Sequence, residues 1–286
     1  MKNVYDLLII GGGVSGCLVA YSLLSKGYKG EIAIVEHGRN LGGRSSSRIS
    51  LRNNGIILNH GSANFNILES NKDKLINKFL NDLLQKNLIT LDDSQVYEIN
   101  SNLEISLFNQ NYFYQGNVYR AKNSMSDLLA ELINEGVKKN KIKLFFNTLI
   151  TNFEFKNNKW IASSIKEKFH SKFLISSSNL ILHNRSLQIL KKENLPIREA
   201  IPEGKNKNID KIINFINKQD SLKRVNYLIY PNKFYTLKKN NIKNNIHFLF
   251  NQKAEKKFGF ERIIFQKQES QKIGIVIHTK DFNYLR

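Results

Sequence analysis

The chain has 286 residues, more than one hydrophobic core usually holds, which predicts one large domain or two interleaved ones. Its formal net charge is +20, but the lysines are spread along the whole length and no RNP, zinc-finger or basic-helix pattern accompanies them. The composition therefore predicts no specific nucleic-acid partner, although the charge can draw anionic substrates or cofactors to the surface.

The cysteine content and the lengths of the apolar runs bear on location. The single cysteine, Cys17, excludes a disulfide framework and predicts a reducing, cytoplasmic setting. The apolar stretch from Tyr5 to Leu24 is interrupted by Asp6 and by glycines. No other segment approaches the roughly 20 apolar residues that cross a bilayer, so we expect a soluble protein without a membrane span.

The N-terminal residues have the pattern of a dinucleotide-binding βαβ unit. A short apolar run at 4–10 predicts a buried parallel strand, and the glycine-rich segment 11–16 (GGGVSG) follows at once and fits G-x-G-x-x-G. Residues 17–26 predict a helix. A second apolar strand at 32–35 then leads into Glu36, an acidic residue at the distance that the motif requires.

Each part of this unit has a physical role. Gly11 permits the tight turn, Gly13 lets the backbone approach a pyrophosphate, and Gly16 allows close packing of helix and strand. The helix N-terminus offers free N–H groups and a partial positive charge. Glu36 can accept hydrogen bonds from ribose hydroxyls and disfavours a 2′-phosphate, so NADP is not expected here. The predicted cofactor contacts in this unit are Gly11, Gly13, Val14, Ser15, Gly16 and Glu36.

Shortly after Glu36 comes the segment 40–48 (NLGGRSSSR), which an NAD dehydrogenase does not need. It resembles the L-G-G-R motif of the FAD-dependent amine-oxidase superfamily. The resemblance implies FAD as the cofactor, with Gly42 and Gly43 close to it, Arg44 on its pyrophosphate and Ser45 beside them. A guanidinium fork suits that role. The alternative interpretation is a basic surface loop.

The segment 57–65 (ILNHGSANF) looks like the D-H/L-G-A-Q-Y/F stretch of renalases, which are flavoproteins of that superfamily. In renalases this turn passes near the flavin, which implies His60 and Gly61 as cofactor contacts. Asn59 replaces the usual Asp, so the polar details differ. A histidine packed into the turn, without a cofactor contact, is the equal alternative for His60.

The middle of the chain is expected to complete the cofactor domain. Residues 119–129 predict a loop entering a helix, which Ser124 or Ser126 caps. Strands are expected at 143–146, at 150–156, around Trp160 and at 172–179, the last returning the chain to the dinucleotide sheet. The resemblance to renalases implies that the backbone of Leu149 meets the adenine ring. The serines at 176–178 are cofactor contacts or, as the simpler interpretation, the start of a loop.

Stretches of a different character alternate with these segments. An amphipathic helix is expected at 69–87, and half-buried strands at 97–99 and 104–108. After residue 180 a helix is expected at 209–218. Further strands are expected at 225–230, 234–237, 246–250, 263–266 and 273–278. Aromatic residues in this part, among them Tyr112, Phe113 and Tyr114, either line a cavity for a planar substrate or form plain core, and core is the preferred interpretation.

The predicted fold class is α/β, with a Rossmann-like FAD-binding domain interleaved with an α+β antiparallel-sheet substrate domain. The FAD-binding domain is expected at 1–66 and 119–182, and the substrate domain at 67–118 and 183–286. No cluster of metal ligands or paired carboxylates competes with this interpretation. No catalytic acid or base is assigned, and Cys17 inside the first helix is not expected to act as a nucleophile.

The resemblance implies an FAD-dependent oxidoreductase that takes a hydride from a small reduced substrate of the dihydronicotinamide type, with reoxidation by dioxygen. An amine- or polyene-directed flavin oxidase is one alternative. The other is a non-catalytic dinucleotide-binding relic, because the resemblance ends near Thr279 without the G-G-D-type segment with which renalases bind the flavin, as expected of a truncated or short variant. The tail at 280–286 does not supply that segment.

Overall fold

The computed structural model describes residues 4–50, 55–68, 73–108, 116–178, 181–219, 224–231, 245–268 and 272–279. The strand expected at 234–237, the aromatic residues 112–114 and the tail 280–286 lie outside these ranges. The chain forms two compact units. The first comprises Met1–Gly43 and Leu129–Ser221, and the second comprises Arg44–Leu128 and Leu222–Arg286.

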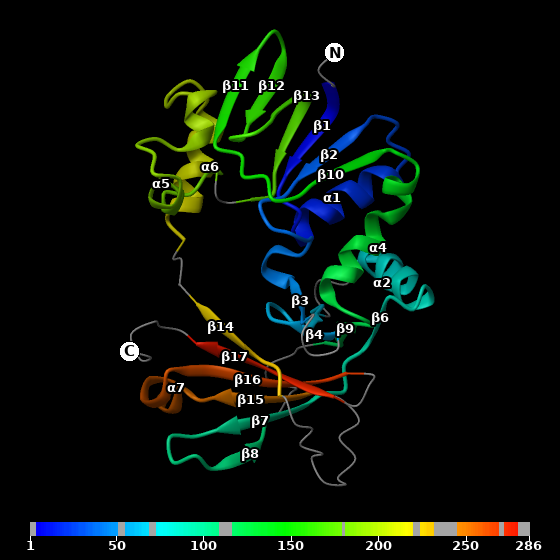
Figure 1. The fold of residues 1–286 in the computed structure, drawn as a ribbon, viewed down its shortest axis with the longest axis vertical. Helices are drawn as coiled ribbons and strands as arrows, with labels where there is room; N and C mark the ends of the chain where they lie inside the picture. The colour runs from blue at the N-terminus through cyan, green and yellow to red at the C-terminus, as the bar shows by residue number, and fades with distance from the viewer. Residues whose placement is uncertain are drawn as a thin grey trace. The chain divides into compact units, whose positions relative to one another are not determined.

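The first unit is built on a six-stranded sheet with the order β10-β2-β1-β13-β12-β11 (Figure 1). Its parallel part consists of β1 (Val4–Ile10), β2 (Ile32–Val35), β10 (Ile142–Phe145) and β13 (Lys168–Ser176). The hairpin of β11 (Asn152–Lys156) and β12 (Lys159–Ser163) extends it in antiparallel fashion. The strand that was expected to return the chain to this sheet is β13, which pairs with β1.

Two helices precede strands of this sheet in the chain. Helix α1 (Val14–Ser25) connects β1 to β2, and α4 (Met125–Lys138) precedes β10. In α4 the position of Gly136 has no room for a side chain, because a Cβ there would lie 2.4 Å from Leu24 Cδ1 of α1. The remaining helical elements follow β13: α5 (Arg185–Leu190), the short 3-10 helix η4 (Pro196–Glu199) and α6 (Lys207–Asn217).

Burial in the first unit follows the strand pattern of the sequence. All four residues of β2 are buried, as are five of the seven residues of β1, which is typical of parallel strands covered on both faces. Phe153 and Phe169 join Leu8 and Val35 in one core cluster. A second cluster of Leu195, Ile197 and Ile213 fixes η4 and α6 beside Trp160.

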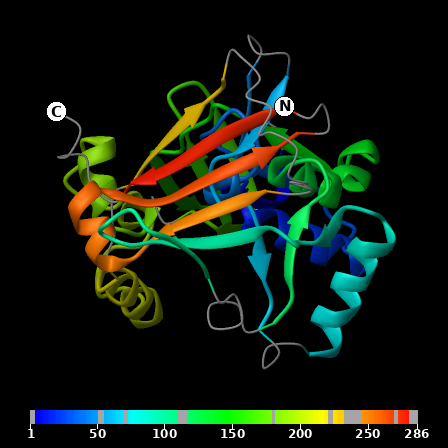
Figure 2. The same ribbon diagram turned by 90° about the horizontal axis from the view of Figure 1, so that it is seen from below.

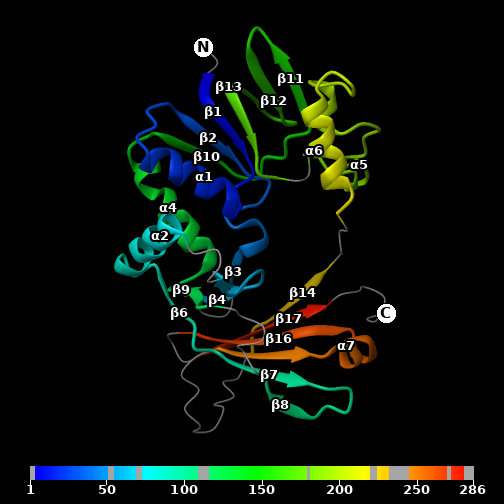
Figure 3. The ribbon, with the colours of Figure 1, turned by 180° about the vertical axis from the view of Figure 1, so that it is seen from behind.

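The second unit contains another six-stranded sheet, in the order β14-β17-β16-β15-β7-β8 (Figure 2). All its pairs are antiparallel except β7 with β15, which is parallel. The strands are β7 (Gln95–Ile99), β8 (Ile105–Leu107), β14 (Val225–Ile229), β15 (Ile246–Phe250), β16 (Phe260–Lys267) and β17 (Ile273–Thr279). Helix α7 (Gln252–Phe258) joins β15 to β16 at the end of these strands (Figure 3).

Three smaller elements complete the second unit. They are the hairpin of β3 (Ser47–Ser50) and β4 (Ile56–Asn59), a three-stranded sheet of β5 (Phe65–Asn66), β9 (Val118–Ala121) and β6 (Ile89–Leu91), and helix α2 (Lys74–Gln85). Leu58 of the hairpin packs on Ile264 and Val276 of the large sheet. Gly274 permits this approach, since a Cβ there would lie 2.3 Å from Leu58 Cδ2.

The predicted α/β class with an additional antiparallel sheet is confirmed, and most expected elements form. The helix expected at 69–87 is α2, and residues 69–72 lie outside the described ranges. The expectation that 104–108 alternates between buried and exposed is wrong, because β8 is an edge strand whose three residues are all exposed. Ile105 and Leu107 are 58% and 73% exposed.

The boundaries of the two compact units differ from the predicted domain boundaries. Residues 44–66 and 119–128 were assigned to the FAD-binding domain and cluster with the second unit, whereas 183–221 were assigned to the substrate domain and cluster with the first. The packing explains this: the hairpin β3–β4 contacts the large antiparallel sheet, and α6 contacts the hairpin β11–β12 through Trp160. The division into functional domains stays a prediction.

Candidate cofactor-binding site

The glycine-rich turn between β1 and α1 needs glycine at two of its positions for its own geometry. Gly11 has a φ of +108°, a backbone conformation that residues with a side chain rarely adopt. At Gly16 a Cβ would lie 2.1 Å from the carbonyl oxygen of Gly11, so helix and turn leave no space there. These two glycines therefore have the structural roles that the motif predicts, the tight turn and the close packing.

Gly13 is different, because nothing in the described chain requires it to be glycine. Its φ is −77°, which every residue adopts. A Cβ there would come no closer than 3.9 Å to any heavy atom, namely the Gly42 carbonyl oxygen and the Gly43 Cα. The open space above this backbone is where the motif predicts the pyrophosphate, so the geometry of Gly13 fits a bound dinucleotide.

The second glycine pair lies directly against the first. The Gly42 N–H donates to the carbonyl oxygen of Gly12 at 2.9 Å, and Gly13 and Gly42 form a parallel β-bridge. A Cβ on Gly43 would lie 3.3 Å from the Gly13 Cα, and Gly43 has a φ of +54°. The fold thus brings together two glycine segments that are about 30 residues apart in the sequence, at the start of α1.

No side chain among the described residues caps the first turn of α1. Its N-cap, Gly13, has no side chain to accept a hydrogen bond, and no acidic residue stands in the first turn. Ser15 in this turn is exposed. The positive end of the helix is therefore available to an anion, in the position where βαβ units hold a pyrophosphate.

Glu36 lies at the end of β2, as predicted, and its carboxylate is held by backbone donors. The Gly12 N–H donates to Oε2 at 2.6 Å, and the Gly38 N–H donates to Oε1 at 2.5 Å. A carboxylate oxygen accepts more than one hydrogen bond, so each oxygen retains capacity for a ribose hydroxyl. The residue is partly exposed, which leaves this edge open to a ligand.

The backbone around Leu149 also lies at this edge. The Thr148 N–H donates to the Glu36 carbonyl oxygen and the Asn147 N–H to that of Gly38, each at 3.0 Å. The next residue, Leu149, has no hydrogen bond from its own N–H or C=O to the part of the chain that the structure describes. This backbone position, close in the fold to Glu36, fits the predicted contact to an adenine ring.

Ser177 supports the turn and was not assigned this role from the sequence. Its hydroxyl lies 3.0 Å from the Ile10 carbonyl oxygen and 2.8 Å from that of Gly11, so it holds the end of β1 and the first glycine. From the sequence alone, the start of an ordinary loop is the simpler interpretation of the serines at 176–178. The signal available was their place directly after the strand that pairs with β1, where parallel strands end at one edge.

Cys17 lies inside this unit but is chemically inert. Burial, with the nearby charge of Glu36, raises the pKa of its thiol to about 12, so the thiol stays protonated at neutral pH. Its Sγ contacts the Gly12 carbonyl oxygen at 3.6 Å. A protonated, fully buried thiol agrees with the expectation that Cys17 is not a nucleophile.

The remaining predicted contacts lie in the second unit, where two of their segments are joined. Arg44 is exposed, and its carbonyl oxygen accepts a hydrogen bond from the Ser62 N–H at 3.1 Å. Gly61 must be glycine, because a Cβ there would lie 2.0 Å from the same carbonyl oxygen. Ser45 beside it is buried. Contact of Arg44, Ser45 and Gly61 with a cofactor stays a prediction.

His60 is held by its own surroundings in the second unit. Its Nε2 lies 2.9 Å from Ser46 Oγ, and its carbonyl oxygen accepts from Asn226 Nδ2 at 2.6 Å and from His278 Nε2 at 3.2 Å. Burial, followed by the charges of Arg48 and His278, lowers the pKa of His60, which favours the neutral imidazole. These contacts match the interpretation of a histidine packed into a turn, and its contact with a flavin stays a prediction.

Neighbouring polar residues of the second unit form a network that fixes the start of α4. Asn59 Oδ1 accepts from Ser47 Oγ at 2.7 Å and from the Met125 N–H at 3.0 Å. Ser124 caps the helix, since its Oγ accepts from the Asp127 N–H at 3.1 Å and donates to the Asp127 carboxylate at 2.7 Å. Asn59, which replaces the Asp of the renalase pattern, therefore serves the backbone here.

The described residues contain no group of three or more His, Cys, Asp or Glu side chains arranged to hold a metal ion. None of the helices in the described ranges combines the length and the apolar character that crossing a bilayer requires. In the first unit the residues present fit a bound dinucleotide: an open backbone at Gly13, a helix N-terminus that no described side chain caps, a carboxylate at Glu36 and the backbone of Leu149 close to it.

Comparisons with known proteins agree with this fold. Residues 9–83 match the family described as NAD(P)-binding Rossmann-like domain. No curated protein matches the sequence. The structure is similar to a CLA-producing fatty acid isomerase from P. acnes, with a TM-score of 0.62 and 9% identity over 98% of this chain and 78% of that chain.

Two further solved structures share the arrangement. A putrescine oxidase double mutant with redesigned cofactor binding has a TM-score of 0.57 and 9% identity, over 99% of this chain and 77% of that chain. The tetracycline destructase Tet(51) has a TM-score of 0.50 and 13% identity, over 99% of this chain and 58% of that chain. The chain thus has the mixed α/β fold of these structures, with a Rossmann-like domain and an additional antiparallel sheet.

Proposed function

We propose that the protein is an FAD-dependent oxidoreductase resembling renalases, which takes a hydride from a small reduced substrate of the dihydronicotinamide type. The observation that carries this proposal is the open backbone at Gly13, against which Gly42 and Gly43 pack. The first glycine motif alone supports any dinucleotide. The second glycine pair, placed at the same helix N-terminus, favours FAD, because the resemblance of the L-G-G-R segment is to FAD-dependent proteins.

The residues of the first unit divide the binding of the dinucleotide among them. The N–H groups at the start of α1 hold the pyrophosphate, and Gly13 has no side chain to keep it away. Glu36 accepts hydrogen bonds from the ribose hydroxyls of the adenosine, and the backbone of Leu149 meets the adenine edge. Arg44, Ser45, His60 and Gly61 keep the cofactor contacts that the resemblance implies, as part of the same proposal.

FAD, when bound, supplies a flavin ring that accepts a hydride from a reduced substrate and passes the electrons to dioxygen, giving hydrogen peroxide. The protein contributes position and electrostatics. Because a hydride leaves a dihydronicotinamide without a proton being abstracted first, no general base is required, and none is assigned. A cytoplasmic location and a small-molecule substrate belong to the same proposal.

Flavin binding is the first test. Purified full-length protein should be yellow, or should become so when incubated with FAD, and should retain the cofactor on gel filtration. The variant Gly13→Val should lose FAD, since its side chain fills the space above the turn. The control Asn184→Ala changes the exposed N-cap of α5, which makes no side-chain cap bond either, and should bind FAD like the wild type. A colourless protein that cannot be reconstituted would refute the proposal.

Turnover is the second test and separates the alternatives. FAD-loaded protein should form peroxide when dihydronicotinamide isomers are added and should not do so with polyamines. Peroxide from amines alone would select the amine-directed oxidase. Bound FAD that no dihydronicotinamide or amine reduces would select the non-catalytic relic.

A further inference from the structure

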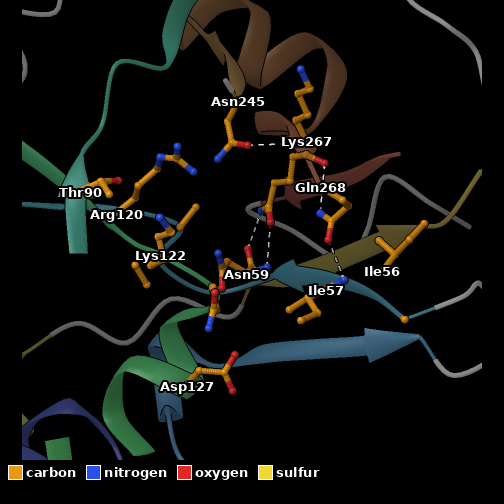
Figure 4. Close-up of a pocket in the computed structure, with 15 residues that line it drawn as sticks. Ile56, Ile57, Asn59, Thr90, Arg120, Lys122, Asp127, Asn245, Lys267 and Gln268 are labelled. Atoms are coloured by element: carbon orange, nitrogen blue, oxygen red, sulfur yellow. Dashed lines mark hydrogen bonds between the residues drawn. The ribbon is translucent and has the colours of Figure 1, made fainter. Parts of the chain in front are cut away.

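The second unit contains a polar cavity of about 580 Å³ that shares no residue with the predicted cofactor contacts. Its walls come from four places: β4 with the residues that flank it, the paired strands β6 and β9 with the loop that follows β9, the first turn of α4, and the adjoining ends of β15 and β16 (Figure 4). A volume in this range is typical of sites for small organic ligands.

Hydrogen-bond donors dominate one wall of the cavity. Arg120 on β9 pairs with Thr90 on β6, so their side chains lie on the same face of the small sheet, and Lys122 follows in the next turn. Figure 4 shows these three side chains grouped beside one another at the cavity. A guanidinium, an ammonium and a hydroxyl together form a wall suited to an oxyanion.

Two buried polar groups at the cavity have hydrogen-bonding capacity that the described chain does not use. Thr90 Oγ1 is buried and has no hydrogen-bond partner among the described residues. Asn245 is only 9% exposed, and its Oδ1 accepts from the Lys267 N–H at 3.0 Å, which leaves its Nδ2 to donate. Buried polar groups are nearly always paired, so these two groups are available to hydrogen-bond a molecule in the cavity.

The floor of the cavity is a rigid network of amides. Gln266 exchanges two hydrogen bonds of 2.8 Å with the backbone of Asn59, and Gln268 Oε1 accepts from the Ile57 N–H at 3.0 Å, as the dashed lines in Figure 4 show. These bonds fix the hairpin on the C-terminal end of β16, an interior strand of the large sheet. A preformed polar floor lowers the entropic cost of holding a ligand.

The charge of the lining is positive. Arg120, Lys122 and Lys267 line the cavity, and Asp127 is the one acidic residue among the described lining residues. The carboxylate of Asp127 is engaged as the capping partner of Ser124. The lining therefore favours an anion over a cation or a neutral ligand.

We propose that this cavity binds a small organic anion whose phosphate or carboxylate group lies on Arg120, Lys122 and the Thr90 hydroxyl. The polar body of the ligand lies against Asn245 and the amide floor. The site lies entirely within the second unit and contains none of the proposed cofactor contacts, although Asn59 and Ala63 flank His60 and Gly61 in the chain.

Isothermal titration of the full-length protein with three probes tests the site. The probes are ribose 5-phosphate, succinate and inorganic phosphate; adenine nucleotides are avoided because they also bind a Rossmann-like domain. One of the two organic anions should bind, more tightly than inorganic phosphate, and excess FAD should not displace it. Tighter binding of ribose 5-phosphate identifies a phosphate ester as the ligand class, and tighter binding of succinate identifies a carboxylate.

Variants locate the binding. Arg120→Ala should weaken binding of the anion about tenfold or more, because a charge-assisted hydrogen bond is lost. Thr90→Val should weaken it about fivefold, because valine keeps the shape of the threonine side chain but lacks its hydroxyl. The control Lys253→Ala removes an exposed positive charge on α7 and should leave the affinity unchanged. The inference is overturned if neither organic anion binds, or if Arg120→Ala, Thr90→Val and Lys253→Ala bind alike. FAD loading, measured on the same samples, reports separately on the proposed function.

Discussion

At the scale of single residues, the glycine motif contains glycines that the fold requires, Gly11 and Gly16, and one, Gly13, that the described fold does not require. Gly16→Ala should lower the free energy of unfolding by about 1–3 kcal/mol, because its Cβ meets the Gly11 carbonyl oxygen at 2.1 Å and backbone must shift. Gly13→Ala should change it by less than about 1 kcal/mol, the size of a helix N-cap effect. Urea unfolding measures both.

Gly13→Ala and Gly16→Ala serve as controls for each other, because both add one methyl group to the same short segment of the chain. Equal loss of stability in both would show that the space above Gly13 is not open in solution. Unchanged stability in Gly16→Ala would show that the turn and α1 are less tightly packed than the Cβ distance indicates.

The thiol of Cys17 offers a second prediction at this scale. Because burial raises its pKa to about 12, the thiolate is absent at pH 8, and native protein should react with a thiol reagent far more slowly than unfolded protein. Absorbance of the released thiol product measures the two rates. Cys17→Ala should remove the signal and retain FAD. Fast labelling of the native state would contradict the buried, protonated thiol.

The residues of the cofactor motif were predictable because their pattern is local. Gly11, Gly16 and Glu36 follow one another within a single βαβ unit, and the geometry of that unit fixes their spacing. Ser177 was not assigned because it reaches the same turn from more than 160 residues further along the chain. The hydrogen bonds of His60 to residues of β14 and β17 were hidden for the same reason.

At the scale of elements, β15 carries a buried histidine without a partner. His247 is 1% exposed, and neither ring nitrogen has a hydrogen bond among the described residues. Burial, together with the nearby charges of Arg262 and His278, lowers its pKa to about 4, and the charge of Asp92 partly opposes this shift. The folded state therefore favours the neutral imidazole of His247.

This depressed pKa predicts how β15 responds to acid. The pKa of His247 in the folded state lies below its unfolded value of 6.5. The stability that the folded state has with neutral His247 is therefore fully present above pH 6.5 and is lost as the pH falls toward 4. Protonation of His247 should therefore cost the wild-type protein about 2 kcal/mol of unfolding free energy between pH 7 and pH 5. The variant His247→Leu should not show this part of the loss. Urea unfolding at both pH values measures the difference.

The exposed His37 provides the matched control for this experiment. His37→Leu should keep the full pH dependence of the wild type. If His247→Leu also keeps it, the imidazole is solvated or paired in solution, and its burial in the sheet is not what sets its protonation.

Elements were predictable in proportion to the length of their pattern. The strands at 4–10 and 246–250 and the amphipathic helix α2 have enough consecutive residues to show a pattern. The hairpin β3–β4 and the small sheet β5-β9-β6 consist of strands of two to four residues, too short for any period, and were not anticipated. The small sheet forms because segments distant in the chain pair with one another, and side chains at the end of β16 hold the hairpin; the cavity at Arg120 depends on both.

At the scale of the whole molecule, the net charge of +20 determines how stability responds to salt. With a sequence pI of about 9.8, like charges repel one another throughout the neutral pH range. Raising NaCl from about 10 mM to about 150 mM shortens the screening length from about 30 Å to about 8 Å. The repulsion in the compact state falls, and the Tm at pH 7 should rise by a few degrees.

The pH supplies the control for the salt effect. At pH 9.5, close to the pI, the net charge is small, so the same addition of NaCl should change the Tm much less. Replacing NaCl by sodium phosphate at equal ionic strength separates screening from anion binding. If the Tm rises further in phosphate and Arg120→Ala abolishes this additional rise, the rise comes from anion binding in the cavity of the second unit, because screening does not depend on one residue. A Tm that stays constant or falls with NaCl at pH 7 would show that the spread of lysines, interleaved with acidic side chains, leaves no net repulsion for salt to relieve.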